Sequence, residues 1–382
     1  MKRIVFLLVI LMLTVSVFSS VAIFATSESN AVNARAAYVI EPTSGTVIYE
    51  QNAKDKHPIA SMVKIMTALI TLESIDKGIL SLDEQITISE SASGMGGSQM
   101  FIEANDIYSV SDLLKGIIVV SANDASVQMA ERLAGSEEEF VTLMNARAKE
   151  LGMNNTHFTN CTGLPAPSNY SSAEDVGIMT MELIKHKLYY NYSKIWMEDF
   201  KHPDGRTTGF VNTNKLIRFY NGCDGGKTGF TDEAMFCLSA SAKRNDMRVI
   251  AVVMGAPSSK IRFAEATKLL NTAFAKYENK LIVDKDNLGI DPLNVSNGKT
   301  NSLKLQLDKS VYALIKKGEK VSYETKIELN EKVRAPIKAG EQVGTLYVID
   351  KGVVISERPI IASEDIMEAS YWDYVVKLLS NW

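Results

Sequence analysis

The chain has 382 residues, enough for two or three domains at roughly 150 residues each. Hydrophobic residues make up 46% and charged residues 23%, which excludes a wholly disordered chain, a collagen-like repeat and a polytopic membrane protein. The 41 basic and 45 acidic residues give a net charge of −4, so no basic excess indicates nucleic acid as a partner. Three cysteines, four histidines and the lack of CxxC or HExxH spacing argue against a metalloenzyme.

The N-terminus predicts export. Lys2 and Arg3 precede an apolar run over residues 4–25 that ends among small residues, which is typical of a secretory signal peptide over residues 1–25. The run is also nearly long enough to be an uncleaved anchor helix. Under either alternative, the rest of the chain lies outside the cytoplasmic membrane.

The cysteine count fits such a compartment only in part. An odd number of cysteines leaves at least one thiol unpaired in an exported protein. Cys223 and Cys237 flank a short segment and can pair only if the geometry allows it. We expect three free, mostly buried thiols with no catalytic role.

After the N-terminal segment, strands precede and follow a helical stretch. Strands are predicted at 37–40 and 46–50, around a turn at 42–45. Apolar periodicity predicts helices over 59–75, 111–120, 125–134 and 261–277. A polar turn at 243–246 predicts a hairpin of the apolar runs 235–242 and 248–255. This order predicts one α/β domain over residues 26–278, whose sheet is completed by late strands.

The remaining residues predict a second domain and a tail. Short alternating runs separated by polar turns predict a small all-β domain over 279–362, with strands near 303–307, 321–329, 342–349 and 353–360. From Ile366 to Trp382, apolar and aromatic residues recur at helical spacing. This tail, residues 363–382, is predicted to lie in a membrane interface as an amphipathic helix. The alternative is a terminal helix that packs on its own protein.

Ser61-Met62-Val63-Lys64 is the first of three short motifs with chemical meaning. S-x-x-K alone is weak, since it also occurs at 74–77 and 296–299. Ser61, however, stands at the start of a predicted apolar helix, where free N–H groups and the helix dipole stabilise an oxyanion. Lys64 lies three residues later on the same helix face, and it can accept the serine proton if its pKa is lowered.

Ser121-Ala122-Asn123 is the second motif, and it falls between two predicted helices. By itself it is equally explained as an N-cap, a position at which Ser and Asn are favoured.

Lys227-Thr228-Gly229 is the third motif and follows Gly225-Gly226 at the start of a strand. Glycine lets a backbone approach a ligand closely, and an edge strand can pair with an extended peptide. Alone, the tripeptide is equally explained as a solvated turn.

Together and in this order, the three motifs form the signature of penicillin-recognising serine enzymes. The chain resembles the low-molecular-weight penicillin-binding proteins that act as D-alanyl-D-alanine carboxypeptidases, serine peptidase family S11. Further segments of the chain also resemble this family, namely 96–99, 112–116, 162–165, 170–173 and 261–263. The resemblance implies a β-lactamase/transpeptidase-like domain, with an antiparallel sheet flanked by helices and a helical subdomain, followed by the small β domain and tail.

The resemblance also implies an activity and its participants. The enzyme would remove the terminal D-alanine from peptidoglycan stem pentapeptides through an acyl-enzyme, which limits cross-linking, and β-lactams would acylate it. It would need no metal or organic cofactor and would act at the outer face of the cytoplasmic membrane, held there by the tail.

Roles for individual residues follow from the same resemblance. Ser61 is the nucleophile, Lys64 the general base and Ser121 a proton relay. The substrate-binding residues are Asn123, Lys227, Thr228, Gly229, Phe230 and Arg262, with the backbone N–H groups of Ser61 and Phe230 as the oxyanion hole. From charge alone, we expect Lys64 and Lys227 in one cleft to disfavour each other's protonation.

Other functions fit the motifs in part. A class A β-lactamase has aspartate at the middle of the second motif, where this chain has Ala122, and no E-x-x-L-N segment follows. A non-catalytic β-lactam sensor or peptidoglycan-binding protein on the same fold is the alternative from another class. A transpeptidase or endopeptidase on the same scaffold is a nearer alternative, which differs in whether water or an amine takes the acyl group.

Overall fold

The computed structural model describes residues 31–330 and 332–380. The predicted signal peptide lies outside these residues. No helix in the described ranges has the length and apolar character needed to cross a membrane. The three cysteines are free thiols, two of them buried, as predicted from the sequence.

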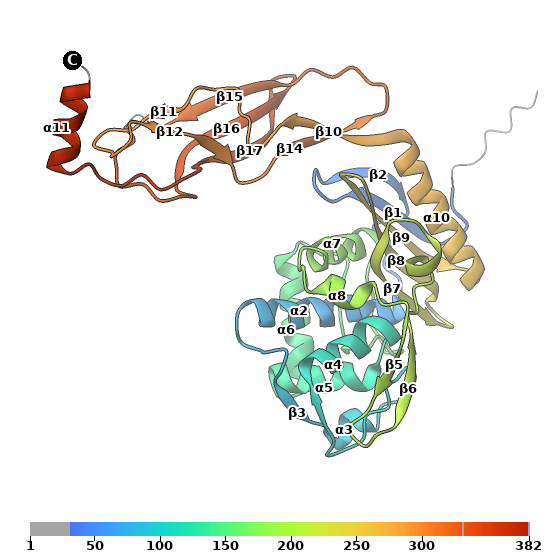
Figure 1. Cartoon of the computed structure of the whole chain (residues 1–382). Helices are drawn as coiled ribbons and strands as arrows, with labels where there is room; N and C mark the ends of the chain where they lie inside the picture. The colour runs from blue at the N-terminus through green and yellow to red at the C-terminus, as the bar shows by residue number, and fades with distance from the viewer. Residues whose placement is uncertain (1–30, 331, 381–382) are drawn as a thin grey trace, which may run out of the picture. The chain divides into compact units, whose positions relative to one another are not determined.

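A five-stranded antiparallel sheet forms the frame of the α/β part (Figure 1). Its order is β2-β1-β9-β8-β7, so late strands complete the sheet, as predicted, and the hairpin β8–β9 lies between the first strand and β7. The strands are β1 (Ala36–Glu41), β2 (Thr46–Gln51), β7 (Cys223–Thr231), β8 (Met235–Arg244) and β9 (Met247–Ala256). The inner strands β1 and β9 are almost wholly buried because both faces of the sheet are covered. Strand β7 lies at the edge of the sheet.

Helices cover both faces of the sheet. Helix α10 (Ser259–Lys276) packs on β8 and β9 from one side, and α7 (Ala173–Leu183) packs on β1 and β9 from the other (Figure 1). Ser258 and Ser172 cap these helices through their side chains. The predicted transpeptidase-like fold class is confirmed.

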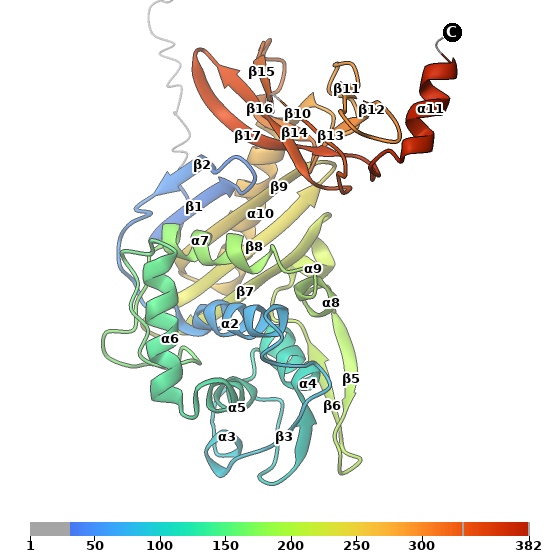
Figure 2. The ribbon, with the colours of Figure 1, turned by 90° about the vertical axis from the view of Figure 1, so that its left-hand side faces the viewer.

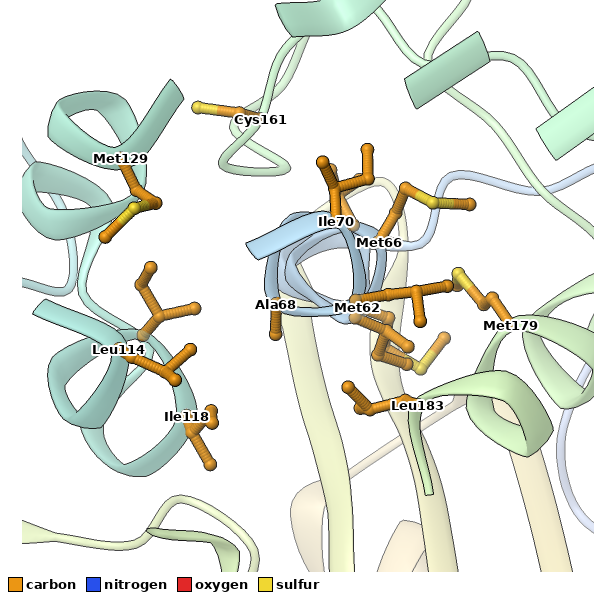
Figure 3. Close-up of a cluster of buried hydrophobic side chains, with 14 of the residues drawn as sticks. Met62, Met66, Ala68, Ile70, Leu114, Ile118, Met129, Cys161, Met179 and Leu183 are labelled. Atoms are coloured by element: carbon orange, nitrogen blue, oxygen red, sulfur yellow. The ribbon is translucent and has the colours of Figure 1, made fainter. Parts of the chain in front are cut away.

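The helical subdomain is built around α2 (Lys64–Asp76). Residues 64–72 are all buried, because a helix that is apolar all round must be surrounded by other elements. Figure 3 shows Leu114, Ile118 and Met129 on one side of this helix and Met179 and Leu183 on the other. The other elements of the subdomain are β3 (Gln85–Thr87), α3 (Glu90–Ser93), β4 (Ile107–Ser109), α4 (Val110–Lys115), η2 (Gly116–Val120), α5 (Asn123–Ala134), α6 (Glu137–Glu150) and α8 (Tyr189–Ser193).

A two-stranded ribbon and a short helix complete the α/β part. Strands β5 (Met197–Lys201) and β6 (Thr207–Val211) form an antiparallel pair that runs beside α4 (Figure 2). The one-turn helix α9 (Leu216–Phe219) then leads into β7. The sequence did not predict this ribbon.

The C-terminal part is β-rich, as predicted, with its own apolar core. Strands β13, β17, β16 and β15 form a four-stranded sheet, and β10 pairs with β14. The strands are β10 (Tyr277–Val283), β11 (Leu293–Asn294), β12 (Ser302–Leu303), β13 (Leu305–Leu307), β14 (Val311–Lys316), β15 (Glu324–Leu329), β16 (Gln342–Asp350) and β17 (Val353–Ala362).

The terminal helix α11 (Tyr371–Ser380) begins five residues later than the periodicity predicted. Ile366 is buried in the β-rich core and exchanges backbone hydrogen bonds with Ile337, so it cannot join the helix. Ser370 instead caps the helix, since its Oγ accepts from the backbone N–H of Asp373 at 3.4 Å and its own backbone N–H donates to the Asp373 carboxylate at 2.8 Å.

Candidate functional site

Ser61 lies in a tight turn before α2, not within the α-helix that was predicted over 59–75. The turn η1 (Ala60–Val63) is a 3₁₀ segment, and the α-helix begins at Lys64. Ala60 has a positive φ of 48°, which a non-glycine residue adopts only when its surroundings enforce it. Two glycines from elsewhere in the chain, Gly163 and Gly229, pack against this turn.

Both positions require glycine, because the turn approaches their Cα atoms too closely to leave room for a side chain. A Cβ atom on Gly229, in β7, would lie 2.5 Å from the carbonyl oxygen of Ile59. A Cβ atom on Gly163, which has a φ of +78°, would collide with the carbonyl of Ala60 and lie 2.8 Å from the backbone nitrogen of Ser61. Backbone from two other segments of the chain therefore encloses the Ser61 turn.

The Lys64 ammonium group is held by three oxygen atoms. Its Nζ lies 3.2 Å from Oγ of Ser61, 2.6 Å from Oδ1 of Asn123 and 2.5 Å from the carbonyl oxygen of Thr162. The side chain is fully buried, and this burial lowers its pKa from 10.5 to about 7, although the nearby Cys161 and Asp124 act in the opposite direction.

Ser121 and Asn123 are placed by an irregular helix junction. The π-helical turn η2 ends at Ser121, which has a φ of +65°, and α5 begins at Asn123. The Asn123 side chain donates to the carbonyl of Gly96 at 2.7 Å. Helix α5 has Ala122 at its N-cap and no side-chain capping bond, so the interpretation of the motif as an N-cap is wrong.

Lys227 projects from the edge strand β7 towards this junction. Its Nζ donates to Oγ of Ser121 at 2.8 Å and to the carbonyl of Thr228 at 3.0 Å. Lys227 and Thr228 are both buried, which excludes the solvated-turn interpretation. Burial is the main cause of a strongly lowered pKa of Lys227, and the charges of Lys64 and Arg262 add to it.

The expected mutual repulsion of the two lysines therefore needs a correction. The charge of Lys64 does lower the pKa of Lys227. For Lys64 itself, however, burial is the cause of the lowered pKa, because its side chain is enclosed between α2, α5 and the loop at Thr162.

Arg262 lies against the backbone of the sheet. Its guanidinium donates to the carbonyl oxygens of Gly229 and Cys237, at 3.2 and 3.1 Å, and to Oγ of Ser259. It therefore joins β7, β8 and α10 next to the third motif. Phe230, the neighbour of Gly229, has an exposed side chain that stacks near Phe236.

Sequence reasoning missed Asp124, which directly follows the second motif. Its buried carboxylate accepts hydrogen bonds from the backbone N–H groups of Met100, Phe101 and Ile102. It thereby fixes the loop next to Asn123, whose own N–H donates to the carbonyl of Ser98 at 2.7 Å. Its place after Asn123 was the only signal in the sequence.

The structure thus brings residues from all three motifs into two hydrogen-bonded groups, which the second motif links along the chain through Ser121 and Asn123. Ser61, Lys64 and Asn123 form one group, and Ser121 and Lys227 form the other. In the described part of the chain, no group of three or more His, Cys, Asp or Glu side chains is arranged to hold a metal ion.

Comparison with known proteins gives, over both domains, the family that the sequence motifs indicated. Residues 23–258 match the D-alanyl-D-alanine carboxypeptidase family, and residues 277–368 match the C-terminal domain of penicillin-binding protein 5. The D-alanyl-D-alanine carboxypeptidase DacF of Bacillus subtilis is 41% identical over 350 residues, 91% of this chain and 90% of the relative.

Solved structures agree with this assignment. Penicillin-binding protein 5 of Haemophilus influenzae is 32% identical, with a TM-score of 0.68 over 88% of this chain and 98% of that one. Penicillin-binding protein D2 of Listeria monocytogenes, solved in an ampicillin-bound form, is 33% identical, with a TM-score of 0.57 over 64% of this chain and 98% of that one.

Proposed function

This chain belongs to the D-alanyl-D-alanine carboxypeptidases of serine peptidase family S11, and we propose that it works through Ser61 as the nucleophile. It is a serine-type D-Ala-D-Ala carboxypeptidase that acts on peptidoglycan. Oγ of Ser61 attacks the carbonyl of the penultimate D-alanine, the terminal D-alanine leaves, and water then hydrolyses the acyl-enzyme.

The contacts of Lys64 carry this proposal. A neutral amine has two N–H groups and one lone pair. The two shortest contacts of Nζ are with the Asn123 amide oxygen and the Thr162 carbonyl, both of which can only accept hydrogen bonds. The lone pair is then left for the hydroxyl of Ser61 at 3.2 Å. With a pKa of about 7, Lys64 is partly neutral near neutral pH and can act as the general base.

The remaining motif residues handle the leaving group and the substrate. Ser121, in contact with Lys227, relays the proton to the departing amine, and Asn123 holds the substrate amide. Lys227 and Thr228 bind the terminal carboxylate, with the positive charge of Arg262 behind β7. The backbone N–H groups of Ser61 and Phe230 form the oxyanion hole, which the close approach of Gly229 permits.

Release of D-alanine tests the nucleophile. The purified protein is incubated with a pentapeptide ending in D-Ala-D-Ala, beside the variants Ser61→Ala and Ser74→Ala. Ser74 is the matched control, because it begins another S-x-x-K segment and its hydroxyl only donates to the carbonyl of Ile70. We expect release by the wild type and by Ser74→Ala and none by Ser61→Ala. Release by Ser61→Ala would refute the assignment.

Labelling by a fluorescent penicillin separates the enzyme from a sensor. Acylation of Ser61 by the β-lactam together with D-alanine release from the peptide supports the enzyme. Stable labelling without any D-alanine release would favour a non-catalytic β-lactam sensor on the same fold.

The proposal includes export and a membrane contact by α11. The described side chains of Tyr371, Trp372, Val376 and Leu379 are largely exposed, between 63% and 76%. Such a set of aromatic and aliphatic side chains suits the interface of a bilayer, and the contact would be mainly hydrophobic. It would place the enzyme at the outer face of the cytoplasmic membrane.

Flotation with lipid vesicles tests this contact. We expect the mature protein to float with vesicles and a chain truncated after Ala369 to remain soluble. Full-length Val376→Asp/Leu379→Asp should also remain soluble, whereas the exposed β-domain change Val353→Asp should not alter flotation. If the truncated chain still floats, the anchor is elsewhere.

A further inference from the structure

A cavity of about 500 Å³ is lined in part by Pro58, which precedes the turn that carries Ser61. It is lined by Lys56 and Pro58, by the loop 165–170 and by Glu233. Its size is within the range of small-ligand sites. None of its lining residues belongs to the three motifs.

Each wall of the cavity continues from a segment that encloses Ser61. Pro58 lies three residues before the nucleophile. The loop 165–170 begins two residues after Gly163, which packs against the backbone of Ala60 and Ser61. Glu233 lies in the turn that follows β7, the strand whose Gly229 packs on Ile59. The cavity is therefore lined by continuations of the segments that enclose Ser61.

The direction of the substrate brings one of its residues to this cavity. With the terminal carboxylate at Lys227 and Thr228, a peptide that pairs with the edge of β7 runs antiparallel to it. Residues before the scissile bond then pass along Phe230 and Thr231 towards Glu233, at about 3.3 Å per residue. The residue that precedes the penultimate D-alanine reaches the cavity.

The polar groups around the cavity carry opposite charges. Lys56 is exposed, and its Nζ stands 4.9 Å from the ring centre of Tyr170, over the rim. Glu233 is exposed as well, and its side chain forms no ion pair with any described residue. Oδ1 of Asn169 is a buried acceptor without a hydrogen-bond partner among the described residues. Such an acceptor is costly unless a ligand donates to it.

We propose that this cavity binds the side chain of the third stem-peptide residue and selects a diamino diacid there. Its distal ammonium group donates to Glu233 and to Oδ1 of Asn169, and its distal carboxylate accepts from Lys56. The inference rests on the proposed function, because it uses the same substrate direction. It assigns the cavity as a specificity site outside the catalytic contacts.

Three peptides that differ only in the third residue test the assignment. The residue is a diamino diacid (diaminopimelate), lysine or the uncharged norleucine, and kcat/KM for D-alanine release is measured for each. We expect the order diaminopimelate, lysine, norleucine, with about three- to tenfold between the first and the last. Glu233→Gln should lower kcat/KM for the two amine-bearing peptides by a similar factor and leave the norleucine peptide unchanged. Lys56→Gln should affect the diaminopimelate peptide alone.

Neighbouring residues provide matched controls. Asp232→Asn and Lys54→Gln remove the same charges at exposed positions that do not line the cavity, and they should leave all three values unchanged. Equal kcat/KM for the three peptides, or equal losses on all three in Glu233→Gln, would overturn the inference while the carboxypeptidase stands. Failure to hydrolyse any of the peptides would instead contradict the proposed function.

Discussion

The Nζ atom of Lys227 lies 2.8 Å from Oγ of Ser121, although the two residues are 106 positions apart in the sequence. One side chain comes from the edge strand of the sheet and the other from the helix junction of the subdomain. The contact is buried. The amine of Lys227 can thus orient the Ser121 hydroxyl, which we propose as the proton relay.

Removal of the Ser121 hydroxyl should therefore slow acylation while the protein stays folded. In Ser121→Ala, Lys227 keeps the carbonyl of Thr228 as a partner, so we expect a stability loss within about 1–3 kcal/mol. Loss of a positioned proton-transfer group should reduce the acylation rate by about 10²-fold or more. Stopped-flow labelling with a fluorescent β-lactam measures the rate.

The control is Ser126→Ala, in helix α5 five positions after Ser121. The hydroxyl of Ser126 is also buried, but it donates only to the carbonyl of Ala122. Its removal should have a similar cost in stability and leave acylation close to the wild-type rate. Equal acylation rates in the two variants would contradict the relay.

The lowered pKa of Lys64 predicts a pH dependence of acylation. The neutral amine is the base, so the acylation rate should rise with pH and level off above a pKa of about 7. Well below that pKa the rate should fall about tenfold per pH unit. Lys64→Arg keeps a permanent charge and should show no such rise. A wild-type rate that stays constant between about pH 5 and 9 would exclude Lys64 as the base.

The same shift predicts how stability depends on pH. Between about 7 and 10.5, the folded chain binds fewer protons at Lys64 than the unfolded chain does. The free energy of unfolding should therefore rise as the pH is raised through this window and fall as the pH is lowered. Denaturant titrations of the wild type and Lys64→Met at several pH values measure it, and this contribution should be absent from the variant.

The sequence predicted the order of the elements around the site better than the backbone within it. The strands before and after the helices, and the largely apolar helix α2, follow from local sequence patterns. The 3₁₀ turn at Ser61 does not, because it depends on Gly163, about 100 positions away, and on the edge strand. The same holds for Ser121: the helix predicted over 111–120 is α-helical only as far as Lys115, continues as a π-helical turn over 116–120 and ends at Ser121 with a positive φ.

The sequence likewise predicted which charged groups meet at the site, but not what sets their pKa values. That two lysines share a cleft could be inferred from the motifs. That burial determines the pKa of Lys64 could not, because it depends on how tightly α2, α5 and the Thr162 loop enclose one atom. Asp124 was overlooked for a similar reason, since its partners are backbone N–H groups some 22 to 24 positions earlier.

The close packing at Gly163 predicts a strong effect of one added methyl group. Gly163→Ala would place a Cβ atom against the backbone of Ala60 and Ser61, so the Ser61 turn must shift. We expect acylation to be lost and the free energy of unfolding to fall by more than about 3 kcal/mol. Thermal unfolding and β-lactam labelling measure the two effects.

Gly152→Ala separates the collision from backbone strain. Gly152 has nearly the same φ, +74° against +78°, and no atom would lie within 4 Å of its Cβ. The free energy of unfolding of this variant should fall only by the cost of holding alanine in the left-handed conformation, about 1–2 kcal/mol. It should be acylated at the normal rate. If Gly163→Ala behaves in the same way, the tight contact with the Ser61 turn is not needed for acylation.

Asp124 affects the site both through its hydrogen bonds and through its charge, and the two effects can be measured apart. In Asp124→Asn, one acceptor oxygen is replaced by a donor, so the N–H groups of the loop at 100–102 lose part of their pairing. We expect a loss of about 1–3 kcal/mol in the free energy of unfolding. The negative charge of Asp124 also raises the pKa of Lys64 against the effect of burial. Without it, that pKa falls, and the acylation profile should move to lower pH.

A purely structural loss would not move that profile. Asp112→Asn is the matched control, because the Asp112 carboxylate caps α4 by accepting from Ser109 at 2.6 Å. It should lower stability and leave the midpoint of the acylation profile in place. If Asp124→Asn leaves the midpoint unchanged or shifts it to higher pH, the charge of Asp124 does not help set the protonation of the proposed base.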